Sequence, residues 1–355
     1  MNRPKFIGVT MWLGLIGMAT VSSDLSYCAD YRPLYEPGMV RGGKNLRAPL
    51  TPPAQPGDPN FWAVEPDVKL YHFAVGTGRT ALIVHGGPGR PHLKPWAGLE
   101  TLTNAYRFIY YDQRGCGQST RPIDRLESRN YYQNLLLVDR TLGLGAQIAD
   151  MERIRQILGE ERLILIGHSF GGFLATMYAA EFPEHVAAMI LVAPADVLVS
   201  PSQSGGLFGE VRSRLPKDQQ DGYDHWLQRY FDFGTLFSKS ETDLVALNDE
   251  FGRYYRMVTF APFPEQGKGG GWITHATYLS MGQQHDYRPI LRNVGAPVLV
   301  IHGAKDLQPE EASRTYVKAL PHAEIRIIEN AEHFPFHTHP AEFAAVVAEF
   351  LSKVQ

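Results

Sequence analysis

The hydrophobic positions along this chain follow two spacings that alternate. Short, largely apolar runs are separated by longer segments in which apolar residues recur every three or four positions, as in an amphipathic helix. Strands are predicted at 61–64, 69–75, 80–84, 106–111, 163–166, 188–192, 298–301 and 324–328. Helices are predicted at 144–158, 173–181, 310–320 and 341–354. Buried strands that alternate with helices are typical of an α/β fold, in which helices cover both faces of a mostly parallel sheet.

This alternation is interrupted once, in the second half of the chain. It stops at Pro194 and resumes at Pro297, and the stretch between them is polar and aromatic, with helical spacing. We therefore predict a core domain built from residues 61–195 and 291–355. A mostly helical cap, residues 196–290, is predicted to be inserted between its two parts.

The first 60 residues have a different pattern. Arg3 and Lys5 precede an uncharged apolar stretch at 6–21, and small residues follow it. A basic start, a short apolar segment and a small-residue exit are typical of a secretory signal, which we predict at 1–23. Residues 24–60 are rich in Pro, Gly and basic side chains without apolar periodicity, and are predicted to form an extended leader.

A cleaved signal predicts an exported protein, periplasmic or secreted, with no stable membrane span after cleavage. The apolar stretch is shorter than the roughly 20 residues of a spanning helix. Two alternatives stay open: an anchor formed by an uncleaved signal, and a lipid attached at Cys28. The chain has two cysteines, Cys28 and Cys116. A disulfide between them is not expected, because Cys28 lies in the processed end or in a loose tail.

Composition limits the classes of function. The chain has 355 residues, of which 44% are hydrophobic and 20% charged, enough to bury a large core. The formal net charge of -3 offers no basic surface for nucleic acid. No phosphate loop or dinucleotide-binding glycine spacing is present, so no cofactor is predicted.

The strongest chemical signal is a serine between a predicted strand and a predicted helix. Gly167-x-Ser169-x-Gly171 directly follows the strand at 163–166. A sharp strand-to-helix turn exposes the side chain above the sheet edge, and glycines allow the close backbone contacts of that turn. Since a serine hydroxyl becomes a strong nucleophile only beside a base, the hypothesis that Ser169 is catalytic requires such a partner.

Two later loops provide an acid and a base in the order that such an elbow requires. Asp306 follows the predicted strand at 298–301, and His333 follows the strand at 324–328. We predict that His333 takes the proton of Ser169 and that Asp306 orients the imidazole and stabilises its cation. His337 and His339 are alternatives to His333. The three nearby histidines could also suggest a metal site. We do not predict one, because no suitable carboxylate–histidine spacing accompanies them.

Attack by the serine on a carbonyl group would give a negatively charged intermediate, whose oxygen would need hydrogen bonds from two backbone N–H groups. The N–H of Phe170, next to the nucleophile, is one, and Gly87 in His85-Gly86-Gly87-Pro88-Gly89 is the other candidate. Asp112 and Arg114, just after the strand at 106–111, are interpreted as a buried ion pair or loop brace. Cys116 is expected to pack beneath the oxyanion loop.

Two motifs together resemble a known family. His85-Gly86-Gly87-Pro88-Gly89, followed by Asp112-Gln113-Arg114-Gly115-Cys116-Gly117-Gln118-Ser119, is similar to the motifs of the proline iminopeptidases, which are α/β-hydrolases. The resemblance runs from about residue 69 to the C-terminus and is weakest in the cap. It implies the α/β-hydrolase fold, and it implies Ser169, Asp306 and His333 as a catalytic triad, with Gly87 and Phe170 as oxyanion donors. It also implies release of an N-terminal residue, often proline, from a small peptide.

Such a peptidase needs a negative group to hold the free ammonium of its substrate. Its relatives use glutamates of the cap, so the resemblance implies Glu250, in Asn248-Asp249-Glu250-Phe251, as one anchor and Glu210 as a second candidate. A solvated helix face is the alternative interpretation for both.

The chain departs from the family pattern in the cap, at Thr338 and at the elbow. Gly-His-Ser-Phe-Gly-Gly replaces the usual Gly-Gly-Ser-Trp-Gly, and the Gly-His-Ser form is shared with esterases. The leading hypothesis is an exported serine aminopeptidase. The alternative is an esterase, lactonase or amidase that acts on a small acyl substrate with the same triad. A non-catalytic binding module on the same fold is a third, disfavoured by the intact motifs.

Overall fold

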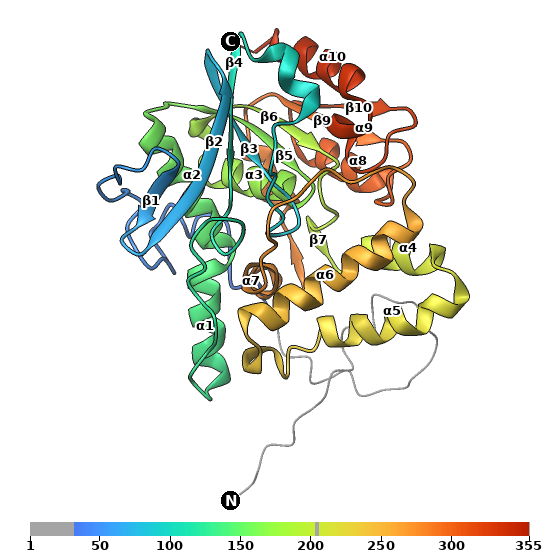
Figure 1. Ribbon diagram of the computed structural model, residues 1–355. Helices are drawn as coiled ribbons and strands as arrows, with labels where there is room; N and C mark the ends of the chain where they lie inside the picture. The colour runs from blue at the N-terminus through green and yellow to red at the C-terminus, as the bar shows by residue number, and fades with distance from the viewer. Residues whose placement is uncertain (1–31, 203–205, 355) are drawn as a thin grey trace, which may run out of the picture.

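The computed structural model describes residues 32–202 and 206–354 (Figure 1). Eight described strands form one sheet in the order β1-β2-β4-β3-β5-β6-β9-β10. Only β2 runs antiparallel to its neighbours, β1 and β4, and every other pair in this sheet is parallel. The strands are β1 (Phe61–Glu65), β2 (Val68–Gly76), β3 (Arg79–Val84), β4 (Tyr106–Tyr111), β5 (Leu163–His168), β6 (Val186–Val192), β9 (Val298–Gly303) and β10 (Ala323–Ile328). The predicted α/β fold with a mostly parallel sheet is confirmed.

Helices cover both faces of the sheet, so its central strands β3, β5, β6 and β9 are largely apolar. In β3, Leu82 and Val84 face one buried cluster, while Ala81 and Ile83 face the other. The first cluster is completed by α2 (Leu144–Leu158), α3 (Phe170–Glu181) and α8 (Glu310–Ala319). The second is completed by the short helix η3 (Ala97–Leu102), α9 (Pro335–Thr338) and α10 (Pro340–Leu351). Burial on two faces removes the polar positions that would otherwise alternate along each strand.

A mostly helical segment separates β6 from β9 along the chain, and we call it the helical insertion. It contains β7 (Val199–Ser200), α4 (Gly206–Arg214), α5 (Lys217–Tyr230), η5 (Leu236–Ser238), α6 (Glu241–Val258), α7 (Trp272–Met281) and β8 (His285–Asp286). Figure 1 shows α5 and α6 side by side beyond one edge of the sheet, on the side toward which α1 (Tyr131–Leu142) extends. The boundaries predicted for a cap, 196–290, stay a prediction. Two short helices complete the fold, η4 (Pro183–His185) and η6 (Arg288–Asn293).

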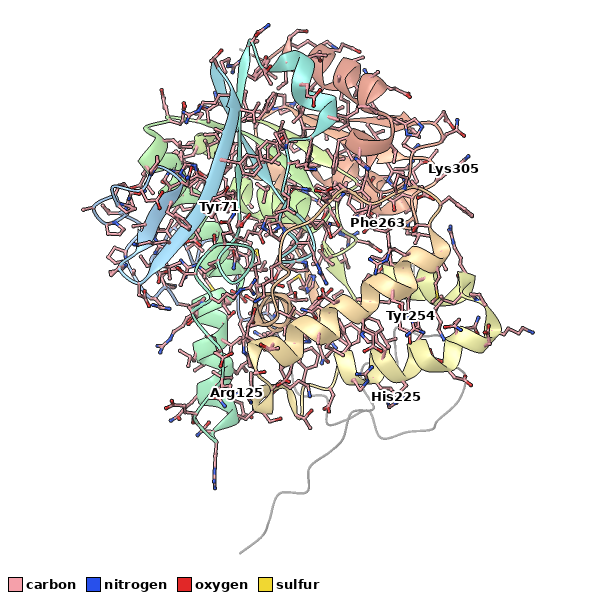
Figure 2. The ribbon with its side chains drawn as sticks, in the orientation of Figure 1. Tyr71, Arg125, His225, Tyr254, Phe263 and Lys305 are labelled. Atoms are coloured by element: carbon pink, nitrogen blue, oxygen red, sulfur yellow. The ribbon has the colours of Figure 1, made fainter. Side chains whose placement is uncertain are left out.

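The insertion has an aromatic core of its own. Trp226 and Tyr223 are fully buried in it and pack on Tyr254 of α6. Figure 2 labels Tyr254 on this layer and Phe263 nearer the sheet. The ring of Phe263 lies 5.3 Å from Tyr255 of α6 and 5.2 Å from Phe334 of the core. Phe263 therefore joins the insertion to the loop after β10.

The leader is packed more closely than predicted. Glu181, at the end of α3, is buried, and its carboxylate accepts hydrogen bonds from the Tyr35 hydroxyl at 3.0 Å and the Gly38 N–H at 2.8 Å. The backbone N–H groups of Val40 and Arg41 donate to the same carboxylate. This part of the predicted extended leader is thus attached to α3, the helix that directly follows Ser169.

The remaining N-terminal predictions concern residues outside the described part of the chain. The signal at 1–23 and Cys28 both lie there. Within 32–202 and 206–354, none of the helices combines the length and apolar character needed to cross a bilayer.

Arg114 belongs to a buried network of four charges. Its guanidinium donates to Asp150 at 2.6 and 2.5 Å and to Glu65 at 2.8 Å, and Arg153 contacts the same two carboxylates. Arg114 therefore lies in a buried ion-pair network, but an ion pair between Asp112 and Arg114 is not present. The Asp112 carboxylate instead accepts the N–H of Gln118 at 2.8 Å, and burial raises its pKa to about 6.

Candidate active site

Ser169 lies at a strained turn between β5 and α3. Its φ is 53°, in the left-handed region that residues with a side chain seldom adopt. A Cβ on Gly171 would lie 2.0 Å from the carbonyl oxygen of Val84, so the turn can form only with glycine there. The Ser169 side chain makes no capping hydrogen bond to α3, is partly exposed and borders a cavity. Its hydroxyl is therefore presented to the cavity rather than used to hold the helix.

Asp306 and His333 form a buried pair. Asp306 follows β9, His333 follows β10, and His333 Nδ1–H donates to Asp306 Oδ2 at 2.8 Å. Their side chains are 0% and 8% exposed, respectively. The other oxygen, Asp306 Oδ1, accepts the N–H of Gln308 at 3.0 Å. Both oxygens of the carboxylate are thus satisfied, and one holds the imidazole in a defined orientation.

The two alternative histidines lie elsewhere. His337 is exposed on α9, and Nδ1 of His339 lies 3.0 Å from the hydroxyl of Thr338. Of these three histidines, the geometry pairs His333 with Asp306. In the described ranges, no three His, Cys, Asp or Glu side chains gather in a way that could hold a metal ion.

His168, next to the predicted nucleophile, connects the elbow to the histidine loop. Its Nε2–H donates to the carbonyl oxygen of His333 at 2.9 Å, and the two rings lie 4.7 Å apart. Burial holds the pKa of His168 well below its usual range, so its ring is neutral. Because His168 contacts the loop that carries His333, the next residue, Ser169, lies close to that loop. Sequence reasoning assigned His168 no role, although the Gly-His-Ser form of the elbow was the available signal.

The glycine loop after β3 packs on the elbow from the other side. A Cβ on Gly86 would lie 2.8 Å from the Cβ of Ser169, and Gly87 borders the same cavity as Ser169 and Phe170. The first N–H groups of α3, beginning with Phe170, have no partner within that helix. The structure therefore gathers the two predicted oxyanion donors around Ser169, and their role stays a prediction.

The second family motif supports this loop. His85 Nδ1–H donates to the Gly86 carbonyl at 3.0 Å, and His85 Nε2 accepts the N–H of Gln113 at 3.0 Å. Burial lowers the pKa of His85 to about 4, which keeps Nε2 free to accept. Cys116 is fully buried beside them, with Sγ 3.5 Å from His85 Nε2 and donating to the Gln113 carbonyl. Cys116 thus packs beneath the loop, as expected, and is a free thiol.

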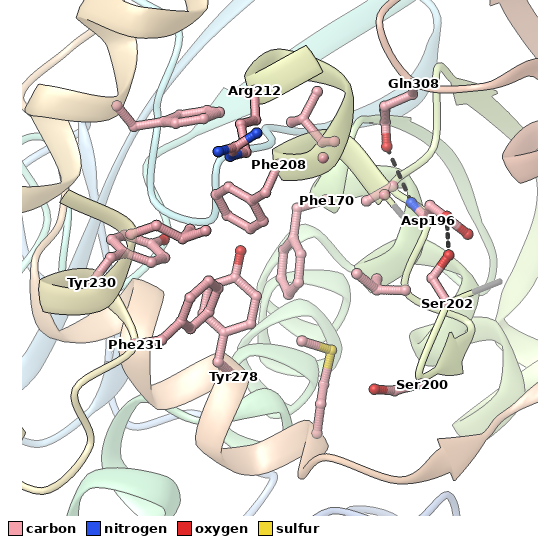
Figure 3. A pocket seen from close by; sticks show the side chains of 18 of the residues that line it. Phe170, Asp196, Ser200, Ser202, Phe208, Arg212, Tyr230, Phe231, Tyr278 and Gln308 are labelled. Atoms are coloured by element: carbon pink, nitrogen blue, oxygen red, sulfur yellow. Dashed lines mark hydrogen bonds between the residues drawn. The ribbon is translucent and has the colours of Figure 1, made fainter. Parts of the chain in front are cut away.

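A cavity of about 700 Å³ opens between the elbow and the helical insertion (Figure 3). Its wall includes Ser169 and Gly87 at the sheet edge. Six aromatic side chains contribute to the lining: Phe170, Phe208, Tyr230, Phe231, Phe251 and Tyr278. Figure 3 shows Phe170 facing Phe208 and Tyr278 across this space. The cavity can hold an apolar group directly beside the serine hydroxyl.

The two glutamates predicted to hold an ammonium are placed differently. Arg229 Nη2 lies 2.7 Å from each carboxylate oxygen of Glu250, and Arg214 Nη2 lies 3.3 Å from Glu210 Oε2. Both carboxylates are partly exposed, and neither residue is part of the cavity wall. The structure does not bring Glu250 or Glu210 to Ser169, and the alternative interpretation as solvated helix faces matches their surroundings better.

Comparison with known proteins gives relatives in keeping with this geometry. Residues 81–340 match the family described as the alpha/beta hydrolase fold. The proline iminopeptidase of Heyndrickxia coagulans is 27% identical over 295 residues, which cover 79% of this chain and 92% of that protein. The proline iminopeptidase of Saccharolobus solfataricus is 26% identical over 306 residues, covering 81% and 88%.

Solved structures share the fold. An esterase from Thermogutta terrifontis has a TM-score of 0.53 at 20% identity, covering 85% of this chain and 97% of that one. A proline iminopeptidase from Mycobacterium smegmatis has a TM-score of 0.51 at 19% identity, covering 81% and 96%. The resemblance to the proline iminopeptidases is confirmed, and it supports a hydrolase. Because the family match extends over most of its length, the chain belongs to the α/β-hydrolase fold family.

Proposed function

We propose that this protein is a serine hydrolase with Ser169 as nucleophile, His333 as general base and Asp306 as the acid that orients the base. One observation carries the proposal. The buried Asp306–His333 pair, joined at 2.8 Å, lies against the elbow at which Ser169 faces a cavity. A buried carboxylate that accepts an imidazole N–H is the arrangement that prepares histidine to take a proton.

The roles follow from which atoms are already engaged. Nδ1–H of His333 donates to Asp306, so Nε2 is the nitrogen left to accept the proton of the Ser169 hydroxyl. Ser169 Oγ then bonds to the substrate carbonyl carbon. The resulting oxyanion accepts hydrogen bonds from the backbone N–H groups of Gly87 and Phe170. His333 returns the proton to the leaving group, which departs and leaves an acyl-enzyme. Water, deprotonated by the same histidine, hydrolyses that ester and regenerates Ser169.

For the substrate we propose a peptide whose N-terminal residue, proline or a similar one, is released. The named activity of the relatives from Heyndrickxia coagulans and Saccharolobus solfataricus supports this choice. A second candidate is an esterase, lactonase or amidase acting on a small acyl substrate. The aromatic lining of the cavity, together with the arginine partners of Glu250 and Glu210, favours this second candidate.

Blocking the substrate amine separates the two candidates. Hydrolysis of proline 4-nitroanilide is compared with hydrolysis of its N-acetyl derivative by the same purified protein. An aminopeptidase that binds the ammonium through a charged group should lose about tenfold to a hundredfold in kcat/KM on acetylation. Equal cleavage of the two anilides would reject the aminopeptidase and retain the second candidate.

We further propose export through a signal at 1–23, which the basic and apolar pattern of that segment supports. N-terminal sequencing of the mature protein, after expression of the full chain in a bacterium, provides the test. An intact N-terminus on protein retained in the cytoplasm would contradict this part of the proposal.

A further inference from the structure

We propose that the cavity beside Ser169 is an acyl pocket for a large apolar group, either aromatic or a chain of six or more carbons. The inference rests on the proposed serine-hydrolase function and names its substrate class. It favours the second candidate, whose acyl part is a carboxylic acid. For the first candidate it replaces proline by a large apolar N-terminal residue.

The position of the cavity identifies which half of the substrate it receives. Its wall contains Ser169 and the predicted oxyanion donors Gly87 and Phe170, but neither Asp306 nor His333. The histidine of a serine hydrolase gives its proton to the leaving group, so the leaving group lies on the imidazole side. The cavity lies on the oxyanion side, where the acyl group extends from the carbonyl carbon.

The size of the cavity exceeds what a prolyl group needs. A volume of about 700 Å³ lies well inside the range of roughly 300–1,000 Å³ that buries drug-sized ligands. A five-membered ring would leave most of this volume unfilled, and unfilled apolar volume gives no binding energy. A six- to ten-carbon or aryl-alkyl group makes better use of it.

The chemistry of the wall favours an apolar occupant. The ring of Phe208, on α4, lies 5.3 Å from Phe231, 5.3 Å from Phe251 and 5.7 Å from Tyr230, so four rings form one continuous surface. Such rings contribute large contact areas and stack on aromatic partners. Figure 3 shows Phe208 between Phe170 and Tyr230.

The charged groups on the wall are bound to neighbours within the protein. Arg212 Nε and Nη2 donate to the two oxygens of Asp224, each at 2.6 Å. Asp196 accepts the Ser202 hydroxyl at 2.6 Å, and both ring nitrogens of His285 lie 2.9 Å from backbone carbonyl oxygens. The acyl group thus meets aromatic rings and polar groups that already have hydrogen-bond partners within the protein.

An ester series with one leaving group tests the inference. The 4-nitrophenyl esters of acetic, butanoic, hexanoic, octanoic and 3-phenylpropanoic acid differ only in the acyl part. Each methylene that becomes buried should raise kcat/KM by about fourfold, so hexanoate should exceed acetate by at least about tenfold. A rate that is flat or falls beyond acetate would overturn the acyl-pocket proposal.

A substitution that fills the cavity tests whether the acyl-chain preference arises there. Leu227, on α5, borders the cavity, and Leu227→Trp should lower the hexanoate-to-acetate ratio of kcat/KM by about tenfold. Leu136→Trp is the matched control, since Leu136 is exposed on α1 and absent from the wall. An unchanged ratio in a folded Leu227→Trp protein would contradict the assignment of this cavity. If that variant does not fold, the ester series on the unmodified protein still decides.

Labelling with a fluorophosphonate distinguishes the two levels of the proposal. Labelling of Ser169 together with a flat ester series would reject the acyl pocket alone. Absence of both labelling and ester cleavage would reject the serine hydrolase itself, and the acyl pocket with it.

Discussion

Sequence reasoning selected candidate functional acids both at the sheet edge and in the helical insertion. The two regions give these acids different surroundings. Asp306, at the sheet edge, is fully buried and bonded to an imidazole. Glu250, in the insertion, is about one-third exposed and bound to Arg229 on the surface. A strand end restricts the position of the next side chain, whereas an exposed helix face allows each acid to find the nearest arginine. Acids placed by strand topology are therefore better predicted than acids placed by helix rotation.

Removing the proposed nucleophile at the sheet edge should have the largest effect. Ser169→Ala should lower kcat/KM for 4-nitrophenyl esters by about 10⁴-fold or more, because in the proposed mechanism Ser169 forms the acyl-enzyme. The same variant should lose fluorophosphonate labelling. Ser352→Ala, on an exposed C-terminal turn, is the control and should retain both. Residual activity above a few per cent would mean that another residue is the nucleophile.

The acid of the pair should come next. Asp306→Asn keeps the shape of the side chain but removes the charge and favours the wrong imidazole tautomer, so kcat should fall by about 10³- to 10⁴-fold. Steady-state kinetics on the ester preferred by the unmodified protein measures this loss. A folded Asp306→Asn protein within tenfold of the unmodified rate would contradict the assigned pairing.

A third test concerns stability and examines Arg114, whose charge is buried in the core and does not border the cavity. Arg114→Leu would leave Glu65 and Asp150 with only part of their neutralising partners, at a cost of about 3–5 kcal/mol in the free energy of unfolding. Urea denaturation compares this variant with Arg229→Leu, which breaks an exposed pair and should cost no more than about 1 kcal/mol. Similar losses for the two variants would remove the contrast between core and insertion.

Asp112 makes core stability depend on pH. Burial raises its pKa to about 6 from 3.8, so between these values the folded protein keeps a proton that the unfolded chain has released. The contribution of this group to stability therefore declines as the pH rises from about 4 to about 6, by about 1–3 kcal/mol. Asp112→Asn should flatten that decline in denaturation curves measured across this interval. An equally steep decline in the Asn variant would exclude Asp112 as its source.

The smallest effect is expected in the insertion. Glu250→Gln should change kcat/KM for proline 4-nitroanilide by less than about threefold and the free energy of unfolding by at most about 1 kcal/mol, since its ion pair is exposed. Glu210→Gln should behave alike. A loss of tenfold or more with the free amine, but none with the N-acetyl anilide, would restore Glu250 as the ammonium anchor.

The strands and the acid–base pair were predictable because each depends on local pattern plus one topological rule. The run at 106–111 became β4 with the same limits, and the loops after β9 and β10 brought Asp306 to His333. The Glu65 and Asp150 partners of Arg114 were not predictable, since they come from residues 49 and 36 positions away. The bond from His168 to the His333 carbonyl joins residues 165 positions apart and was missed for the same reason.

By itself, the amino-acid sequence determined the alternation of strands and helices, the elbow at Ser169 and the order serine, acid, histidine, because these depend on spacing along the chain. Only the tertiary structure decided which histidine meets Asp306, which acids lie away from the cavity and how much space adjoins the serine. Those properties depend on how helices of the insertion rotate and pack over the sheet edge, and packing is set by contacts between residues distant in sequence.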